Sequence, residues 1–377
     1  MLPLALLLAL LPPPAAAASR SARPPLQPAA AARLMVQRVL AGTNATGCEW
    51  HGSRDPRCQF GRWNYGDSII LDSLLYASAH VPGVNASGFV DTRLDGWLRD
   101  GNSSAFNISH GIRPRPVGFG QVPDLYPFVY LSQAEFHRHR ARPAPRGYSN
   151  ATALLVGRAG AQSILEWPKL WSDGMISRDD EHPTDSACWG GGPRQPSGGV
   201  KAACVWGDDA TMALTPVSRG VAFSASATRR AEARAWLSKQ HSLYAVHLQD
   251  SGGDGLFFHG QDASLGQHSC CKWSRANGWM MTAHVEVLAA LANSSSSGSG
   301  GGGGRGWQAG HASTEQEQFD AALAIYRSHA AALAKVQSAD GRFYQLLNDS
   351  STWLETSGTC LSQEFKSRVV APFRCAL

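Results

Sequence analysis

The residues of this sequence best suited to chemistry are two neighbouring carboxylates, Asp208 and Asp209, which follow Trp206 and Gly207. At a helix start, one of two adjacent carboxyls can cap the helix while the other faces a ligand. A carboxyl beside an indole and a second carboxyl has a raised pKa, because partial burial and a nearby like charge both disfavour ionisation. Such a group can donate a proton at mild pH. We therefore expect one of the pair to act as an acid, the alternative being that each only caps the helix.

A second group of reactive side chains lies in the stretch 254–279, whose sequence is DGLFFHGQDASLGQHSCCKWSRANGW. His259 can donate a hydrogen bond to a substrate or cap a turn. Arg275 offers a planar fork that suits a substrate carboxylate or, alternatively, a salt bridge to an acidic neighbour. Flat indole faces that suit sugar rings, or that serve as packing anchors, come from four tryptophans: Trp206, Trp273, Trp279 and Trp353. Together these residue types favour a site for an acidic sugar.

The layout around these residues occurs three times. An Asp-Gly turn and a short apolar strand precede a Trp-led polar motif in each copy, and the copies are DGMI (173–176) with WGDD (206–209), DGLF (254–257) with WSR (273–275), and DGRF (340–343) with WLET (353–356). Features that recur in a fixed order indicate a structural repeat. We therefore expect the three Trp-led motifs to occupy equivalent places.

Helices must position these motifs. Apolar spacing and capping residues predict helices at 63–79, 90–98, 123–139, 150–170, 208–223, 228–248, 277–291 and 314–337, with Asn277 as one cap and Thr356 or Ser357 starting a last helix. The intervening strands are too short for a sheet-based domain, so the prediction is a set of helical hairpins. If alternate helices form the inner and outer layers of a toroid, the Trp-led motifs line one funnel. The helix N-termini there favour an acidic ligand.

Composition and the N-terminus limit the classes of partner. The net charge of +5 is spread along the 377 residues, without the basic stripe that a nucleic-acid surface requires. Residues 1–18 form an apolar run that ends in small residues, as a secretory signal peptide does. Three prolines at 12–14 interrupt this run well short of the roughly 20 apolar residues of a membrane span. We expect a secreted protein that binds neither nucleic acid nor membrane.

In a secreted protein, the sequons can be glycosylated and the cysteines can form disulfides. Seven Asn-x-Ser/Thr sequons are present, at Asn44, Asn85, Asn102, Asn107, Asn150, Asn293 and Asn348. In an oxidising compartment the eight cysteines are expected to form disulfides, and we choose only the pair Cys48 and Cys58. The alternative is a zinc site from Cys188, Cys204, Cys270, Cys271 and His268, but no CxxC spacing supports it. No cofactor is therefore expected.

The segments DGLFFH, WSRANGW, WGDDATM and ETSGT resemble the unsaturated glucuronyl and rhamnogalacturonyl hydrolases, glycoside hydrolase families 88 and 105. The resemblance extends over about 63–365. It implies an all-α fold, the (α/α)6 barrel of helical hairpins. It also implies a reaction in which an acid protonates C4 of a 4,5-unsaturated uronic acid, water adds to C5, and the hemiketal collapses to release the next sugar. The substrate would be an oligosaccharide of the pectin or rhamnogalacturonan type.

The same resemblance assigns roles to individual residues. The catalytic Asp of the family's Trp-x-Asp motif falls on Asp208, with Asp209 as the second choice. The binding His matches His259. The Trp-x-Arg-x-x-Gly-Trp segment matches three residues: Trp273, Arg275 and Trp279. A second family Asp, at a helix start in the N-terminal half, is best matched by Asp124 in GQVPDLYP.

The domain organisation that follows is a signal peptide at 1–18, a flexible lead-in at 19–45, and a glycosidase-like domain at 46–377 with a low-complexity insertion at 293–312. Family members continue for at least one more hairpin after ETSGT. We therefore expect a ring incomplete at the C-terminus, with apolar inner surface exposed and activity reduced. The competing functions are a hydrolase of unsaturated glucuronyl units from glycosaminoglycan-like chains and a non-catalytic carbohydrate-binding toroid or fragment.

Overall fold

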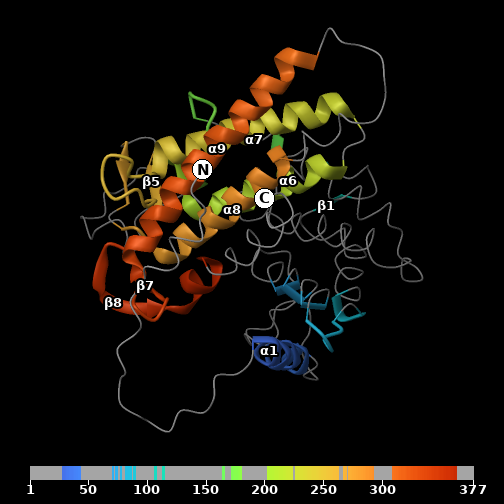
Figure 1. Cartoon of the computed structure of the whole chain (residues 1–377), viewed down its shortest axis with the longest axis vertical. Coiled ribbons are helices and arrows are strands. Elements are labelled where there is room, and N and C mark those ends of the chain that lie inside the picture. The colour runs from blue at the N-terminus through green and yellow to red at the C-terminus, as the bar shows by residue number, and fades with distance from the viewer. Residues whose placement is uncertain are drawn as a thin grey trace, which may run out of the picture.

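The structure is a computed structural model. It describes residues 28–43, 70–90 except 72, 75, 76, 79, 80 and 87, and then 106–107, 113–114, 164–165, 171–180, 202–223, 226–262, 266–269, 271–292 and 308–362. This part of the chain is mainly helical (Figure 1). None of the helices within these ranges is long and apolar enough to span a membrane.

The first complete helical hairpin consists of α6 (Gly207–Phe223) and α7 (Ala227–Leu248), as the apolar spacing predicted. Ser226 caps α7, because its hydroxyl accepts a hydrogen bond from the backbone N–H of Arg229 at 3.3 Å. Only one face of α7 is buried, through positions three or four apart: Ala233, Leu237, Gln240, His241, Tyr244 and Leu248. In α6, by contrast, every residue from 209 to 218 is buried. Thus α6 is an inner helix and α7 an outer one.

The second hairpin repeats this division with α8 (Ser274–Ala292) inside and α9 (Gln308–Val336) outside. The two inner helices pack against each other, and the outer pair run side by side over them (Figure 1). Two boundaries differ from expectation. Residues 308–312, expected within a low-complexity insertion, are helical. Asn277 does not cap α8, because the helix begins three residues earlier and the Asn277 side chain is fully buried inside it.

Short strands connect the hairpins. β3 (Arg178–Asp180), β4 (Ala202–Trp206), β5 (Gly260–Asp262) and β6 (Gln267–His268) form one antiparallel sheet in that order. β7 (Phe343–Leu346) and β8 (Asp349–Glu355) form a hairpin, and β1 (Phe106–Asn107) pairs with β2 (Arg113–Pro114). β4 leads directly into α6, and β8 leads into a helix at 356–362. Each Trp-led motif therefore lies where a strand or bridge meets an inner helix.

The three Asp-Gly turns fold alike. In each turn the aspartate Oδ1 accepts a hydrogen bond from the backbone N–H two residues later, at 2.9, 2.9 and 3.2 Å: Asp173, Asp254 and Asp340. The following glycines all have positive φ, 88°, 81° and 86°: Gly174, Gly255 and Gly341. Glycine adopts this conformation without the steric cost that a Cβ would add. The structure thus confirms the repeat at the level of backbone geometry.

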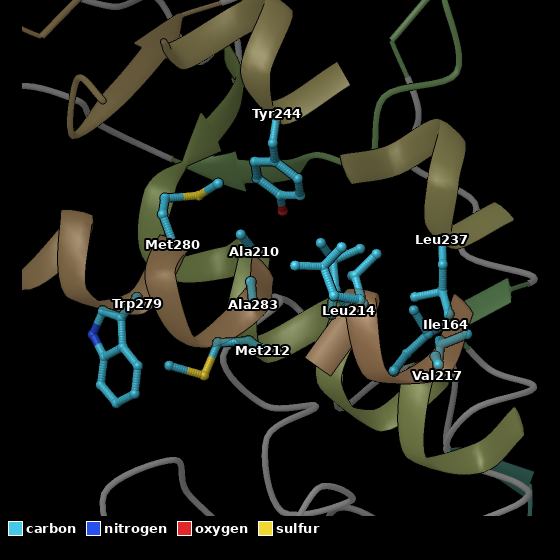
Figure 2. Packing of buried hydrophobic residues seen from close by; sticks show 14 of the residues in the cluster. Ile164, Ala210, Met212, Leu214, Val217, Leu237, Tyr244, Trp279, Met280 and Ala283 are labelled. Atoms are coloured by element: carbon cyan, nitrogen blue, oxygen red, sulfur yellow. The ribbon is translucent and has the colours of Figure 1, made fainter. Parts of the chain in front are cut away.

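The hydrophobic core lies between the inner and outer helices (Figure 2). Its main cluster joins α6, α7 and α8, through residues that include Met212, Leu214, Leu237, Tyr244 and Met280. A second cluster lies under the β7–β8 hairpin and consists of Leu256, Met281, Ala332, Leu333, Phe343 and Leu347. Because α8 contributes the adjacent methionines Met280 and Met281 to different clusters, it is enclosed by protein on more than one side.

The N-terminal region differs from expectation. The segment 19–45 was expected to be flexible, but Pro28–Thr43 forms α1. Its sequence, PAAAARLMVQRVLAGT, is rich in strong helix formers, and Pro28 occupies the first position, where a helix needs no N–H. Val36 joins the main core, and Arg33 Nη1 donates to the Pro82 carbonyl at 2.9 Å. The flexible interpretation is therefore wrong for this part of the segment.

The other sequence-based predictions meet the structure only in part. The described residues between 70 and 78 are helical, as are 88–90 and 164–165, in agreement with three of the predicted helices. The predicted helix at 123–139 and the pair Cys48 and Cys58 lie outside the described residues. Cys360 is an exposed, free thiol, so the expectation of disulfides throughout is wrong for this residue.

Candidate active site

The centre of the candidate site is a carboxylate and imidazole pair at the start of α6. His259 Nε2 lies 2.9 Å from Asp208 Oδ2, although 51 residues separate the two in sequence. The backbone joins the same segments, because Gly207 N–H donates to the His259 carbonyl at 2.8 Å. The side chains are 9% and 23% exposed, so the pair is shielded but the carboxylate still reaches the surface. In this geometry His259 Nε2 can donate a hydrogen bond to one carboxylate oxygen of Asp208.

Two indoles enclose the imidazole. The ring of His259 meets Trp206 edge to face, with centroids 4.5 Å apart, and Trp273 in the same way at 4.9 Å. The guanidinium of Arg275 stacks on Trp273, with its central carbon 3.7 Å from the ring centroid, which is a cation–π contact. The structure therefore brings five sequence-predicted residues together: Trp206, Asp208, His259, Trp273 and Arg275.

The other three predicted residues have different positions. Asp209 is only 2% exposed, since a step of one residue turns it about 100° around α6 from Asp208 and into the protein. Trp279 is 6% exposed and belongs to the main core, where its ring points away from Ala210 and Ala283 (Figure 2). Its carbonyl accepts a hydrogen bond from the Thr211 hydroxyl at 2.5 Å. Asp124 lies outside the described residues.

The strand-like segment 256–259, which carries His259 and leads into β5, is held on both edges by hydrogen bonds. The carbonyl of Leu256 accepts from Asp250 N–H at 2.9 Å, and Phe258 N–H donates to the Leu248 carbonyl at 2.8 Å. His259 N–H donates to the Cys271 carbonyl at 3.1 Å. Both backbone groups of Phe257 bind the side chain of Asn277, each at 2.9 Å. With its backbone groups satisfied, the strand holds a fixed register at the site.

A buried lysine secures the turn before this strand. Lys272 Nζ lies 2.6 Å from Asp250 Oδ2 and 2.7 Å from Asp254 Oδ1, and its side chain is only 6% exposed. The hydrogen bond and the charge of Lys272 lower the pKa of Asp250, so the pairing persists under acidic conditions. The ammonium also lies 4.8 Å from the centre of the Phe258 ring. These contacts fix the Asp-Gly turn relative to the start of α8.

The third repeat contributes one contact near the site. Glu355 Oε2 accepts a hydrogen bond from Ser274 Oγ at 2.5 Å, and Glu355 Oε1 accepts from Ser357 Oγ at 2.5 Å. Ser274 lies between Trp273 and Arg275, so Glu355 supports the segment that carries them. The sequence gives no sign of this partner in α8. Only the packing of the third repeat against the second shows that contact.

The electrostatic field suits an acidic ligand. Asp208 and Arg275 lie in the first turns of α6 and α8, where unpaired backbone N–H groups and the helix dipole create positive potential. In the described part of the chain, no three His, Cys, Asp or Glu residues lie together as a metal-binding group. Of the residues considered for zinc, Cys188 and Cys270 are outside that part. The available chemistry is therefore that of carboxylate, imidazole, guanidinium and indole groups.

Layered helical hairpins, with these groups at the starts of inner helices, place the chain in the all-α helical toroid class of folds. Solved structures share the fold. A family 105 glycoside hydrolase from C. acetobutylicum is 16% identical, with a TM-score of 0.56 over 90% of this chain and 77% of that one. Possible family 105 members from Klebsiella pneumoniae and Salmonella enterica are also 16% identical, with TM-scores of 0.57 and 0.56; they align over 95% and 93% of this chain and 80% and 78% of their own.

A family model matches part of the sequence. Residues 197–364 match the model of Glycosyl Hydrolase Family 88, a range that contains every described residue of the candidate site. The resemblance to glycoside hydrolase families 88 and 105 is thereby confirmed, and with it the all-α toroid fold. Residues 197–364 are thus identified as a glycoside hydrolase region of this type. No curated protein matches the sequence significantly.

Proposed function

We propose that this chain hydrolyses 4,5-unsaturated uronyl oligosaccharides of the pectin or rhamnogalacturonan type, with Asp208 as the catalytic acid and base. The observation that carries the proposal is the hydrogen bond between His259 Nε2 and Asp208 Oδ2 at 2.9 Å, between two indoles and beside a stacked guanidinium. Because His259 holds Oδ2, the proton for the substrate is carried by the other carboxyl oxygen.

The reaction needs only one carboxyl group. Protonated Asp208 transfers its proton to C4, so the C4–C5 π electrons form the new C–H bond and positive charge develops at C5 beside the ring oxygen. The resulting carboxylate then takes a proton from a water molecule, whose oxygen bonds to C5. Asp208 is thereby protonated again, and the hemiketal collapses with release of the next sugar. The hydrogen bond from His259 holds the carboxyl group in place while it gives and takes these protons.

Arg275 and the tryptophans bind the sugar in this scheme. The stacked face of the Arg275 guanidinium is occupied by Trp273, but its edge N–H groups can form two parallel hydrogen bonds with the uronate carboxylate. The positive potential of the two helix starts adds to this attraction. Trp273 would contribute apolar surface beside the ring, while Trp206, which is buried, packs behind His259. The carboxylate, which is common to all substrates of this class, is thus recognised next to the double bond that reacts.

The substrate class can be tested directly. The purified chain is mixed with unsaturated rhamnogalacturonan disaccharide and, separately, with unsaturated disaccharides from glycosaminoglycans, and the ultraviolet absorbance of the conjugated acid is followed. We expect loss of absorbance with the first substrate and release of the leaving sugar. Loss only with the second would assign the glucuronyl activity instead. If neither absorbance falls while calorimetry shows binding, the non-catalytic toroid is the correct function.

We also propose that the chain enters the secretory pathway and carries N-linked glycans. Two of the sequon asparagines, Asn85 and Asn348, have exposed side chains, and Asn348 lies in the tight turn between β7 and β8. Expression in a secreting eukaryotic cell should give a mobility shift on removal of N-glycans. Asn348→Gln should reduce that shift by one glycan. A protein retained in the cytosol, or one without any shift, would contradict the proposal.

A further inference from the structure

Three buried histidines form a continuous hydrogen-bonded chain from the outer helices to the candidate site. His241 Nε2 in α7 lies 2.6 Å from His284 Nδ1 in α8, and His284 Nε2 lies 3.1 Å from His329 Nδ1 in α9. His329 Nε2 then lies 2.9 Å from Asn277 Oδ1. All four side chains are completely buried. The chain thus crosses three helices and ends on the residue that anchors the strand of His259.

The hydrogen-bond partners of Asn277 fix the direction of this chain. Its Nδ2 donates to the carbonyls of Phe257 and Trp273, both at 2.9 Å, so its oxygen must be the atom that faces His329. His329 Nε2 therefore carries a proton, and its Nδ1 is an acceptor. By the same reasoning, His284 Nε2 carries a proton and donates it to His329 Nδ1. His241 Nε2 likewise carries a proton and donates it to His284 Nδ1. Each imidazole is the Nε2–H tautomer and donates to the next group.

His241, the first member of the hydrogen-bonded histidine chain, agrees with this direction. His241 Nδ1 is buried and has no hydrogen-bond partner among the described residues. In the derived tautomer this atom is an acceptor, and a buried acceptor without a partner is less unusual than an orphaned N–H. Burial lowers the pKa of His241 to about 4 and that of His329 to about 3, and it also lowers the pKa of His284. All three rings are therefore neutral near pH 7, as the assigned hydrogen bonds between the histidines require.

The last link controls the strand register through the amide of Asn277. Its oxygen accepts from Phe257 N–H as well as from His329, and its nitrogen binds the Phe257 carbonyl. If the amide were flipped, its NH2 group would face two donors. The Phe257 ring also packs on the chain, with centroids 4.6 Å from His329 and 5.7 Å from His284. Phe257 is two residues from His259, so its position sets that of the imidazole.

The equivalent strands of the other repeats are anchored more simply. In the first repeat Gln240 performs both functions, since its Oε1 accepts from Ile176 N–H at 2.9 Å and its Nε2 donates to the Gly174 carbonyl at 2.7 Å. In the third, Thr359 Oγ1 accepts from Phe343 N–H at 3.0 Å. An amide or a hydroxyl alone is thus enough to anchor a strand of this kind. The histidine chain is an addition at the strand that bears His259.

We propose that His241, His284 and His329 are positioning residues, whose hydrogen-bonded chain holds Asn277 in the single amide orientation that places His259 against Asp208. The catalytic consequence rests on the proposed function, whereas the structural consequence does not. Leucine or phenylalanine could fill the same volume without burying six ring nitrogens, so packing alone gives no reason for the chain. A directed polar network, in contrast, selects one arrangement of its members.

Two substitutions of the last histidine separate donor chemistry from volume. His329→Gln keeps an N–H donor close to the imidazole Nε2, whereas His329→Leu keeps only apolar volume. We expect His329→Leu to lower kcat about tenfold with KM within about threefold, and His329→Gln to retain kcat within about threefold. Thermal unfolding of both variants checks that each is folded.

Amide hydrogen exchange tests the same idea without any substrate. We expect exchange of the peptide 256–259 to rise about tenfold in His329→Leu and by less than about threefold in His329→Gln. The equivalent peptide of the third repeat, 343–346, should be unchanged in both variants. If the wild type hydrolyses none of the substrates, the proposed function fails, and the exchange result still decides the positioning role. Equal exchange at 256–259 in the two variants would overturn the proposal.

A measurement on the wild type covers the case in which His329→Leu does not fold. Nitrogen chemical shifts of histidine labelled with ¹⁵N distinguish the two neutral tautomers from the imidazolium form. We expect three buried histidines in the Nε2–H form at pH 6. Finding an Nδ1–H tautomer or a charged ring among His241, His284 and His329 would overturn the direction assigned to the hydrogen bonds between these histidines.

Discussion

The second and third repeats start from the same turn and end in different surroundings. In the second, Trp273 lies against His259 and carries Arg275 on its face, whereas Trp353 in the third is 65% exposed. The connections between turn and tryptophan differ. In the second repeat the connection includes β5 and β6, while β7 and β8 of the third are joined by a turn of two residues. A shared scaffold therefore does not by itself create a site, because the inserted loop supplies the functional groups.

The comparison also shows that the site belongs to more than one repeat. Asp208 belongs to the Trp-led motif of the first repeat, His259 belongs to the second, and Glu355 of the third supports Ser274. Repetition brings these ends to one place, since every inner helix starts near its neighbours. The differences between copies then allow each repeat a distinct task. The following predictions test that division, from the largest effect to the smallest.

Removing the carboxylate should distinguish the first repeat from the third most strongly. Asp208→Asn is expected to lower kcat/KM about 10³-fold, because the amide can neither donate the proton to C4 nor accept one from water. The matched change Glu355→Gln in the third repeat should cost less than about tenfold, since Glu355 supports the site through Ser274 only. Loss of ultraviolet absorbance measures both. Equal losses would mean that the proton donor has been assigned to the wrong repeat.

The buried histidines should make the second repeat sensitive to mild acid. Burial holds the pKa of His241 at about 4 and that of His329 at about 3, so only the unfolded chain takes up these protons as the pH falls below about 6.5. Stability is complete above this pH and is lost between about pH 6.5 and 4. Between pH 7 and 5.5 we expect the free energy of unfolding to fall by about 1 kcal/mol for each of the three histidines.

Denaturant titrations at several pH values measure this loss. In the third repeat the hydrogen bonds of Arg342 lower the pKa of Asp340, so that carboxylate does not titrate in the same range. His241→Gln removes one titrating ring and should make the pH dependence shallower. An unfolding free energy that stays constant from pH 7 to 5.5 would contradict neutral buried imidazoles.

The strand anchors should differ in their contribution to stability. Asn277→Ala leaves both backbone groups of Phe257 buried without their partner and should lower the free energy of unfolding by about 2 kcal/mol or more. Thr359→Ala removes one partner, that of Phe343 N–H, and should cost about 1 kcal/mol. Chemical denaturation of the two variants gives the comparison. A larger loss for Thr359→Ala would show that the third strand, and not the second, is the more strongly held.

The different environments of Trp273 and Trp353 give the smallest predicted effect. Trp273→Ala should raise KM about tenfold, since it removes a wall of the site and the platform on which Arg275 stacks. Trp353→Ala should leave KM within about twofold, because the described structure places no site residue on that indole. Initial rates over a range of substrate concentrations test the pair. A comparable rise for Trp353→Ala would extend the binding surface to the β7–β8 hairpin.

Local sequence signals predicted much of this fold. Apolar spacing located α6, α7 and α9 within a few residues, and the Asp-Gly pairs located three turns whose geometry is nearly identical. Asn277 was misassigned because asparagine favours helix caps, whereas here a tertiary partner, Phe257, uses the amide inside the helix. The helix α1 was missed because an Ala-rich segment next to prolines shows no amphipathic period.

The candidate site was predictable only through resemblance, and the histidine chain was not predictable at all. Nothing in the local sequence connects His259 with Asp208, since that contact depends on β5 pairing with β4 next to α6. Likewise His241, His284 and His329 are single polar residues in three separate helices. Their relation exists only once the helices have packed. Long-range contacts of this kind leave no periodic signal.

The link between Gly207 N–H and the His259 carbonyl has a consequence for the history of the chain. It joins the start of one hairpin to the strand of the next, at the point where the acid and its partner meet. Duplication of a single hairpin would therefore have copied half of the reactive pair and half of its support. Descendants of such an event could diverge in their loops, but exchange of one hairpin between relatives would break both bonds at once.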